Sequence, residues 1–282
     1  MTQYIFLSPH LDDVPLSCGG MLAQLVIAQA KVKVITVFAG IPPLKDPISA
    51  FADYQHQLWG NPQQAYNTRR REDKTALAYF GLKPIWLDFF DCIYRGQPGQ
   101  GNWYYNSDED IFGPVYPAEF SAVGLIVEAV ETITRVAEGT DGTIIYAPLT
   151  VGNHVDHQLT FLAALRLLES GAQVYFYEEY PYADRDLAHL TRALHETTPV
   201  LLGQTLDLAW KLAQREPGAL WRSTLKTFSP LALELKIKAI AAYKTQLDVL
   251  FGGEEAMVQR VTAYARRVGC GEPGERFWAL NL

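Results

Sequence analysis

The first 38 residues constrain the fold more than any other part of the chain. Residues 4–7 are apolar at every position and end at Ser8-Pro9, residues 21–26 have a helical pattern, and residues 31–38 form a second strand-like run. A short run that is apolar throughout is typical of a strand buried on both faces of a parallel sheet. Strand, helix and strand within about 35 residues predict a βαβ unit, whose parallel strands are joined by a right-handed crossover.

The rest of the chain continues this alternation of strands and helices. We predict strands at 85–87, 143–148 and 174–177, and helices at 68–80, 122–136 and 159–168. Beyond Pro181 the pattern is mostly helical, over 186–214, 230–250 and 254–267. The sequence therefore predicts one α/β domain over 1–282, with a mostly parallel sheet flanked by helices in a core of about 1–182 and additional C-terminal helices in about 183–282.

Two connecting segments stand out by their composition. Residues 41–62 are rich in proline and are expected to form a loop. Residues 89–118 hold many Gly, Pro, Tyr and Trp residues, among them Trp103, Tyr104 and Tyr105. A loop of this length inside a compact domain is more often functional than a spacer. We expect residues 96–116 to shape a substrate pocket, although aromatic residues serve equally often as loop anchors.

Composition and charge exclude several classes of protein. The 282 residues include 24 Lys+Arg and 31 Asp+Glu, a net charge of −7 without a basic block, which argues against a nucleic-acid-binding protein. No apolar run reaches the roughly 18 residues of a membrane-spanning helix, and the N-terminus lacks the basic region of a signal peptide. Three scattered cysteines are too few for a disulfide scaffold or a thiolate zinc cluster. We expect a cytoplasmic protein of undetermined oligomeric state.

Two dense polar clusters each follow a predicted strand. One comes directly after residues 4–7 and the other just after residues 143–148. In open parallel sheets, ligands bind outside the carboxyl ends of the strands. The clusters contain three of the six histidines of the chain and three aspartates, namely His10, Asp12, Asp13, His154, Asp156 and His157.

Imidazole and carboxylate together suit a catalytic zinc or ferrous site. Two histidines and one carboxylate leave coordination positions for water and substrate, and a further carboxylate can act as general base. Each cluster alone also has a plainer interpretation. An Asp pair after a strand is often a turn or a helix cap, and His-x-x-His near a helix start can cap and pack. The occurrence of both clusters at strand ends favours the metal site.

Three motifs resemble those of the PIG-L/LmbE-like N-deacetylases. Residues 9–13 (Pro-His-Leu-Asp-Asp), followed by Cys18-Gly19-Gly20, resemble the N-terminal signature of that family. Residues 154–157 (His-Val-Asp-His) resemble its second signature, and residues 69–72 resemble the Arg-x-x-Glu helix between the two. The resemblance covers about residues 4–180. It implies a Rossmann-like fold and a zinc-dependent hydrolase that removes the N-acetyl group of a small-molecule amino sugar or its conjugate.

The resemblance also implies which residues bind the metal. His10, Asp13 and His157 stand at the positions of the family's metal ligands. Two histidines and one aspartate suit Zn²⁺, and they suit Fe²⁺ as well, so the sequence does not decide between these ions.

Four further residues receive roles from the same resemblance. Asp12 corresponds to the general base, and His154 to the histidine that stabilises the oxyanion or helps to protonate the amine. Asp156 would orient a neighbouring histidine, and Arg69 would contact the substrate or support the site.

Several residues near the motifs depart from the pattern or are better explained by packing. Val14 stands where the family often has Glu after the Asp pair, which leaves the predicted ligands and base intact but makes substrate preference less certain. Cys18 is expected to be a small buried residue, because free cysteine behaves as a hydrophobe. Gly19-Gly20 is expected to let the first helix approach the metal loop. His56 is expected at the surface.

Two other functions compete with metal-dependent amide hydrolysis. A catalytically inactive carbohydrate-binding protein on the same fold is favoured only by Val14, and metal content would separate it from the enzyme. A nucleotide-dependent transferase or oxidoreductase needs a glycine loop after the first strand, where this chain has His10, Asp12 and Asp13 instead.

Overall fold

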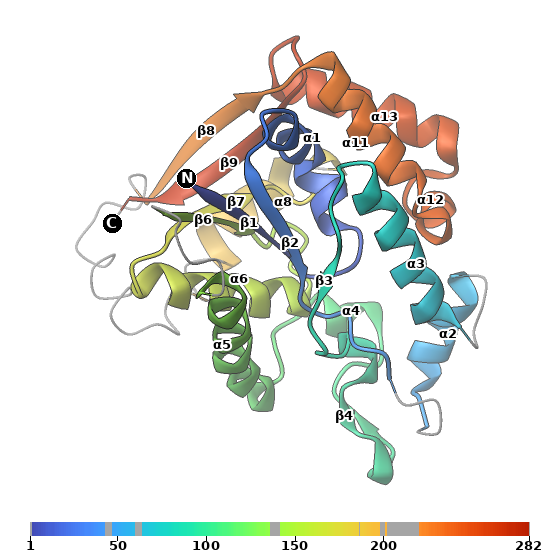
Figure 1. Ribbon diagram of the computed structural model, residues 1–282. Coiled ribbons are helices and arrows are strands. Elements are labelled where there is room, and N and C mark those ends of the chain that lie inside the picture. Colours follow the sequence, from blue (N-terminus) through green and yellow to red (C-terminus); the bar gives the residue numbers. More distant parts are fainter. Residues whose placement is uncertain are drawn as a thin grey trace.

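The computed structural model describes residues 2–42, 47–59, 64–135, 142–185, 187–197, 201 and 220–281. In this part of the chain the main sheet has seven strands in the order β3-β2-β1-β6-β7-β9-β8 (Figure 1). Five of them form parallel pairs: β1 (Gln3–Ser8), β2 (Lys31–Thr36), β3 (Ile85–Trp86), β6 (Thr143–Pro148) and β7 (Gln173–Tyr177). The predicted α/β fold with a mostly parallel sheet is confirmed.

The strand order places the two polar clusters side by side. The chain runs outward from β1 through β2 to β3, and then returns to β6 on the other side of β1. The order therefore reverses between β1 and β6, and in such sheets the crevice at this switch point binds the ligand. One polar cluster follows β1 and the other follows β6, so both lie at the switch point.

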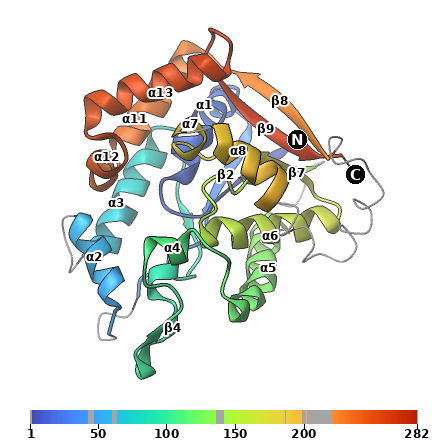
Figure 2. The ribbon, with the colours of Figure 1, turned by 180° about the vertical axis from the view of Figure 1, so that it is seen from behind.

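Helices cover both faces of the sheet, as Figures 1 and 2 show from opposite sides. The apolar cluster on one face includes residues of α5 (Ser121–Arg135) and α6 (Val155–Glu169). The cluster on the other face includes residues of α1 (Asp13–Ile27), α3 (Ala65–Ala78), α11 (Pro230–Ala241), α12 (Lys244–Phe251) and α13 (Glu254–Val268).

Alternation along β1 explains why its residues 4–7 are all apolar. Ile5 and Leu7 pack in the first cluster, whereas Phe6 packs in the second and stacks on Tyr146 with ring centroids 4.6 Å apart. Within the described residues, no helix combines the length and the apolar character needed to cross a lipid bilayer.

The segment 41–62 was expected to form a loop. This prediction is wrong for Ala50–Leu58, which form the helix α2. Ser49 caps this helix through its hydroxyl, which accepts from the Ala52 N–H at 2.9 Å. The proline-rich residues before Ser49 obscured this start signal. The prediction of a surface role for His56 is also wrong, because the ring is buried and contacts the Tyr94 hydroxyl.

The aromatic segment 89–118 is more ordered than a plain loop. It holds the short pair β4 (Gly96–Gln97) and β5 (Asn102–Trp103), the 3₁₀ turns Cys92–Tyr94 and Pro98–Gln100, and the short helix α4 (Asp108–Ile111).

The C-terminal part is helical as predicted in α11, α12 and α13, but it also supplies two strands that the sequence analysis missed. β9 (Gly274–Leu280) pairs antiparallel with β7, and β8 (Trp221–Thr227) pairs with β9. The chain therefore returns from the C-terminal helices to extend the main sheet. In the predicted helical stretch 186–214, the structure describes α8 (Leu187–Arg192) after α7 (Tyr182–Arg185), and a π-helical turn at Ala193–Thr197. Residues 186, 198–200 and 202–214 lie outside the described residues.

The glycine pair serves a different contact from the one predicted. A Cβ at Gly20 would lie 2.3 Å from the Phe228 ring, and one at Gly19 would lie 3.0 Å from the Lys236 side chain. Glu275 of β9 accepts from the Gly20 N–H at 2.9 Å, at the kink that α1 makes at Cys18. The glycines therefore let the C-terminal part approach α1, and not α1 approach the metal loop.

Asp73 of α3 gives the fold a pH dependence that can be measured. Its carboxylate is buried and accepts from the Trp86 indole at 2.6 Å and the Tyr243 hydroxyl at 2.8 Å. Burial raises its pKa from 3.8 to about 7 against these hydrogen bonds. Between pH 4 and 7 the unfolded chain has lost this proton while the folded protein keeps it, so the free energy of unfolding falls as pH rises.

We therefore expect Asp73 to cost about 4 kcal/mol of stability between pH 4 and 7. In Asp73→Asn this part of the pH dependence should be missing. Urea unfolding at pH 4 and pH 8 measures it, with Asp88→Asn as a control because that carboxyl group is exposed. Parallel pH profiles for the native protein and Asp73→Asn would contradict the expectation.

Candidate active site and metal centre

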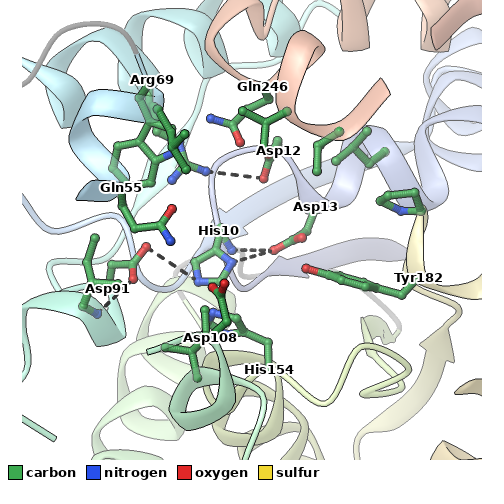
Figure 3. Close-up of a pocket in the computed structure, with 18 of the residues that line it drawn as sticks. His10, Asp12, Asp13, Gln55, Arg69, Asp91, Asp108, His154, Tyr182 and Gln246 are labelled. Carbon is green, nitrogen blue, oxygen red and sulfur yellow. Dashed lines mark hydrogen bonds and ion pairs between the residues drawn. The ribbon is translucent and has the colours of Figure 1, made fainter. Parts of the chain in front are cut away.

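A pocket of about 310 Å³ opens at the carboxyl ends of β1 and β6 (Figure 3). Most of the predicted site residues line it. The polar residues at its floor include His10, Asp12, Asp13, Arg69, Asp91 and His154. His157 and Asp156 lie beneath it on the first turn of α6, fully or almost fully buried.

His10, Asp13 and His157 converge as a metal site requires. Asp13 Oδ2 lies 3.4 Å from His10 Nδ1 and 3.3 Å from His157 Nε2. Nitrogen and oxygen ligands bound tetrahedrally at about 2.0–2.2 Å stand about 3.3–3.6 Å apart, so this spacing fits a Zn²⁺-sized ion. The backbone N–H of His10 donates to the same Asp13 oxygen at 2.7 Å and holds the carboxylate in place.

A carboxylate holds the other ring nitrogen of each of these histidines. His10 Nε2 lies 2.9 Å from Asp156 Oδ2, and His157 Nδ1 lies 3.1 Å from Glu179 Oε1. Metal-binding histidines almost always donate their second N–H in this way, which fixes the tautomer and the ring orientation. The predicted function of Asp156, to orient a histidine, thus has a geometric basis at His10.

The electrostatics of the centre favour a cation. Burial lowers the pKa of His157, but Asp13 and Glu179 outweigh burial and raise it to about 9. Burial also lowers the pKa of His10, but the hydrogen bonds to Asp13 and Asp156 outweigh it and raise that pKa well above its ordinary value. The carboxylates therefore stabilise positive charge at the centre, and a divalent ion bound there would take the place of these protons.

Asp12 lies beside the centre in a position suited to a base. It occupies the N-cap position of α1, yet its side chain makes no capping hydrogen bond. Arg69 Nη2 lies 3.7 Å from Asp12 Oδ1, and the Arg69 guanidinium stacks on Trp59 at 4.6 Å. Burial raises the pKa of Asp12, and the charge of Arg69 opposes this shift. A carboxylate with a raised pKa is a better proton acceptor near neutral pH.

His154 both caps a helix and faces the centre. Its Nδ1 accepts from the Asp156 N–H at 3.2 Å at the start of α6, so in the neutral ring the proton is on Nε2. Burial and the neighbouring His10 hold the pKa of His154 well below its ordinary value. The ring is therefore neutral at pH 7, and its Nε2 N–H faces the Cys92 sulfur at 3.7 Å.

Other combinations of the described side chains could also form a ligand set. A ring nitrogen of His154 lies within 4.8 Å of ligand atoms of His10 and His157. Ligand atoms of Asp91 and Asp156 lie equally near to one another and to His10, and Asp91 Oδ2 is 3.9 Å from His10 Nε2. The role of Asp13 as a ligand and that of His154 as a non-ligand therefore stay predictions.

The segment 96–116, which was expected to shape the pocket, does line it, but only through its C-terminal part and not through the aromatic residues that the sequence analysis singled out. Trp103 and Tyr104 are not among the residues that line it, and Tyr105 is buried, where its hydroxyl donates to Glu119 at 2.6 Å. The pocket wall comes instead from α4 and the residue after it, through Asp108, Ile111 and Phe112.

Other functional contacts come from Glu179, which stands in the polar segment 178–182 after a predicted strand, and from three residues that the sequence did not single out. Arg95 Nη2 binds Asp156 Oδ1 at 2.6 Å, and Glu179 orients His157. Gln55 of α2 and Gln246 of α12 point their amides into the pocket from two sides (Figure 3). Of these four residues, only Glu179 could have been expected at the site from the sequence, because it follows a predicted strand. Arg95, Gln55 and Gln246 reach the site through contacts between segments far apart in the sequence.

The Arg-x-x-Glu motif of α3 connects the site to the C-terminal helices. Arg69 contacts Asp12, whereas Glu72 accepts from the N–H and the hydroxyl of Thr245 at 2.9 and 2.6 Å. Glu72 thus holds the N-terminal end of α12 beside the pocket. Val14, the departure from the family pattern, is fully buried in the apolar cluster of α1 and α11 and does not line the pocket.

Fold and site together define an α/β protein with a histidine–carboxylate centre of the kind used by metal-dependent hydrolases. The model of the PIG-L family, described as GlcNAc-PI de-N-acetylase, matches residues 5–168. The chain belongs to this family and is a hydrolase.

Similar proteins include two curated enzymes with the same name. The 2'-N-acetylparomamine deacetylase of Niallia circulans is 29% identical over 89% of this chain and 83% of its own length. The enzyme of that name from Streptomyces fradiae is 32% identical over 76% of this chain and 70% of its own length.

A solved structure supports the same relationship. A crystal structure described as the zinc-inhibited form of teicoplanin deacetylase Orf2 is 27% identical, with a TM-score of 0.75, and covers 99% of this chain and 98% of that chain. N,N'-diacetylchitobiose deacetylase from Pyrococcus horikoshii, 15% identical with a TM-score of 0.52, shares the fold.

Proposed function

We propose that this protein removes the N-acetyl group from an amino sugar or its conjugate by metal-dependent hydrolysis. The observation that carries the proposal is that His10 and His157 each place a ring nitrogen within 3.4 Å of the same oxygen of Asp13. Beside them lies the Asp12 carboxylate, which makes no helix-capping hydrogen bond. The similar enzymes act on N-acetylated paromamine and on teicoplanin, and they support the substrate class.

His10, Asp13 and His157 would hold the metal, with Zn²⁺ as our first choice and Fe²⁺ as the second. When bound there, the ion supplies Lewis acidity that polarises the acetyl carbonyl and lowers the pKa of water. Asp156 and Glu179 keep the two histidine rings in the orientation that this requires.

The residues of the chain carry the proton and the developing charge. Asp12 accepts the proton of the attacking water, and Arg69 keeps its carboxylate oriented and ionised. As the carbonyl becomes tetrahedral, negative charge grows on its oxygen, and the neutral His154 N–H stabilises it. The amide C–N bond then breaks, the amine takes up the proton, and acetate and the free amino sugar leave.

The test is release of acetate from N-acetylglucosamine glycosides by protein loaded separately with Zn²⁺ and Fe²⁺. Separate loading is needed because zinc inhibits the similar Orf2 protein, as its description states. Turnover with either ion supports the proposal. A protein that binds the glycosides and holds stoichiometric metal without turnover with either ion would be the inactive carbohydrate-binding protein instead.

His154→Ala should retain the metal and lower kcat by about 10²–10³-fold, because it removes one donor to the oxyanion. Metal analysis of the purified variant and steady-state kinetics measure the two effects. His154→Gln is the matched variant, because its amide restores an N–H and should recover part of the rate. A metal-depleted His154→Ala that regains native kinetics in excess zinc would identify His154 as a ligand.

A further inference from the structure

The mouth of the metal pocket is apolar, unlike its floor. Ten large hydrophobic residues of the described chain are prominently exposed, and three of them line this one pocket. They are Tyr54 and Leu58 of α2, exposed by 52% and 42%, and Val249 of α12, exposed by 50%. Leu250 adjoins them and is partly exposed. We call Tyr54, Leu58, Val249 and Leu250 the apolar mouth.

Helix geometry explains how this surface is built. Tyr54 and Leu58 are four residues apart on α2, and Gln246 and Leu250 are four apart on α12, so each pair lies on one helix face. The amide on the α12 face is Gln246 itself, and on α2 it is Gln55, which adjoins Tyr54 in the sequence. Both amides line the pocket. The two helices therefore present the same chemistry from two sides, with amides and apolar side chains on the same faces.

Both helices are held in place, so the mouth is a built surface. The Ser49 hydroxyl caps α2. On the other side, Glu72 of α3 holds Thr245 at the start of α12. Trp59, directly after α2, packs against Arg69 and so links the mouth to the floor where Asp12 lies.

We propose that the mouth binds an apolar aglycone of the substrate, so that the preferred substrate is an N-acetylated amino sugar attached to an apolar group. The inference rests on the proposed function for the position of the sugar at the metal. A sugar with its acetyl group at the floor would occupy the polar part of the pocket, and its substituent could then extend over the apolar mouth. Glutamine amides suit sugar hydroxyls, and the mouth suits a group that gains from leaving water.

Paired glycosides test this inference. For the metal-loaded protein we compare kcat/KM for the butyl and the methyl β-glycosides of N-acetylglucosamine, and dissociation constants for the corresponding free amines by calorimetry. Each methylene removed from water favours binding by about fourfold. Because the mouth is open on one side, we expect the butyl compounds to be favoured by about tenfold in both measurements.

Val249→Gln and Leu58→Gln place a polar group in the mouth at exposed helix positions, so both variants should fold. In each the butyl-to-methyl ratio should fall toward one. The matched control is Leu125→Gln, which changes a leucine of α5 that is 58% exposed and does not line the pocket. This control should keep the native ratio.

The two measurements separate the failure of this inference from the failure of the proposed function. Equal binding of butyl and methyl amines by the native protein would overturn the apolar subsite, whether or not acetate is released. A butyl preference in binding without turnover would refute the proposed function and retain the subsite. Concentration-dependent dimerisation that Val249→Gln abolishes, with no butyl preference, would make the mouth a contact between copies and overturn the inference.

Discussion

Asp12→Asn should bind metal as the native protein does and hydrolyse substrate about 10²–10⁴ times more slowly. Asn has the shape of Asp but cannot accept a proton. The Asp12 carboxylate lines the pocket, makes no capping hydrogen bond and lies 3.7 Å from Arg69, so its removal leaves the helix start intact. Metal analysis and kcat at saturating substrate measure the two parts of the expectation.

Arg69→Gln gives an independent readout of the same base. The charge of Arg69 lowers the pKa of Asp12 against the effect of burial, so its removal should raise that pKa further. Since the base acts when ionised, the rate rises as pH passes the Asp12 pKa, and in Arg69→Gln this rise should move to higher pH. Near-native turnover of Asp12→Asn would remove Asp12 from the mechanism.

The parallel core of the fold could be predicted because its physical signals are local. Residues 4–7 of β1 and 144–148 of β6 are apolar, since helices cover both faces of the sheet, and a polar cluster follows each run. The order of strand and helix then places both clusters at one edge of the sheet. This is why His10 and His157, which are 147 positions apart, could be expected at one centre before their distances were known.

The remainder of the site depends on contacts that no local pattern encodes. α2 follows a proline-rich stretch, and the pairing of β9 with β7 joins segments about 100 residues apart in the sequence. His56 looks like a surface residue in the sequence, yet it is buried against Tyr94. Gln246 reaches the pocket from α12, whose first turn is bound by Glu72 of α3.

The metal assignment has the largest expected effect, because the described residues offer several overlapping ligand sets. In the set that we favour, His10, Asp13 and His157 bind the ion. In the main alternative, Asp91 and Asp156 join His10, and in two further sets His154 joins either His10 and His157 or Cys92 and Asp156. The favoured set leaves Asp156 and Glu179 to hold the second ring nitrogens of His10 and His157, whereas the main alternative uses Asp156 as a ligand.

Asp13→Ala should therefore lose most of the metal and with it nearly all hydrolysis, because one of three protein ligands is removed. Asp91→Ala is the matched control, since it removes a buried carboxylate that also lines the pocket. It should keep metal near the native stoichiometry. Elemental analysis of both variants after dialysis, with circular dichroism to confirm folding, decides between the sets. Full occupancy in Asp13→Ala together with depletion in Asp91→Ala would establish the alternative set and move Asp13 from the metal to the support of His10.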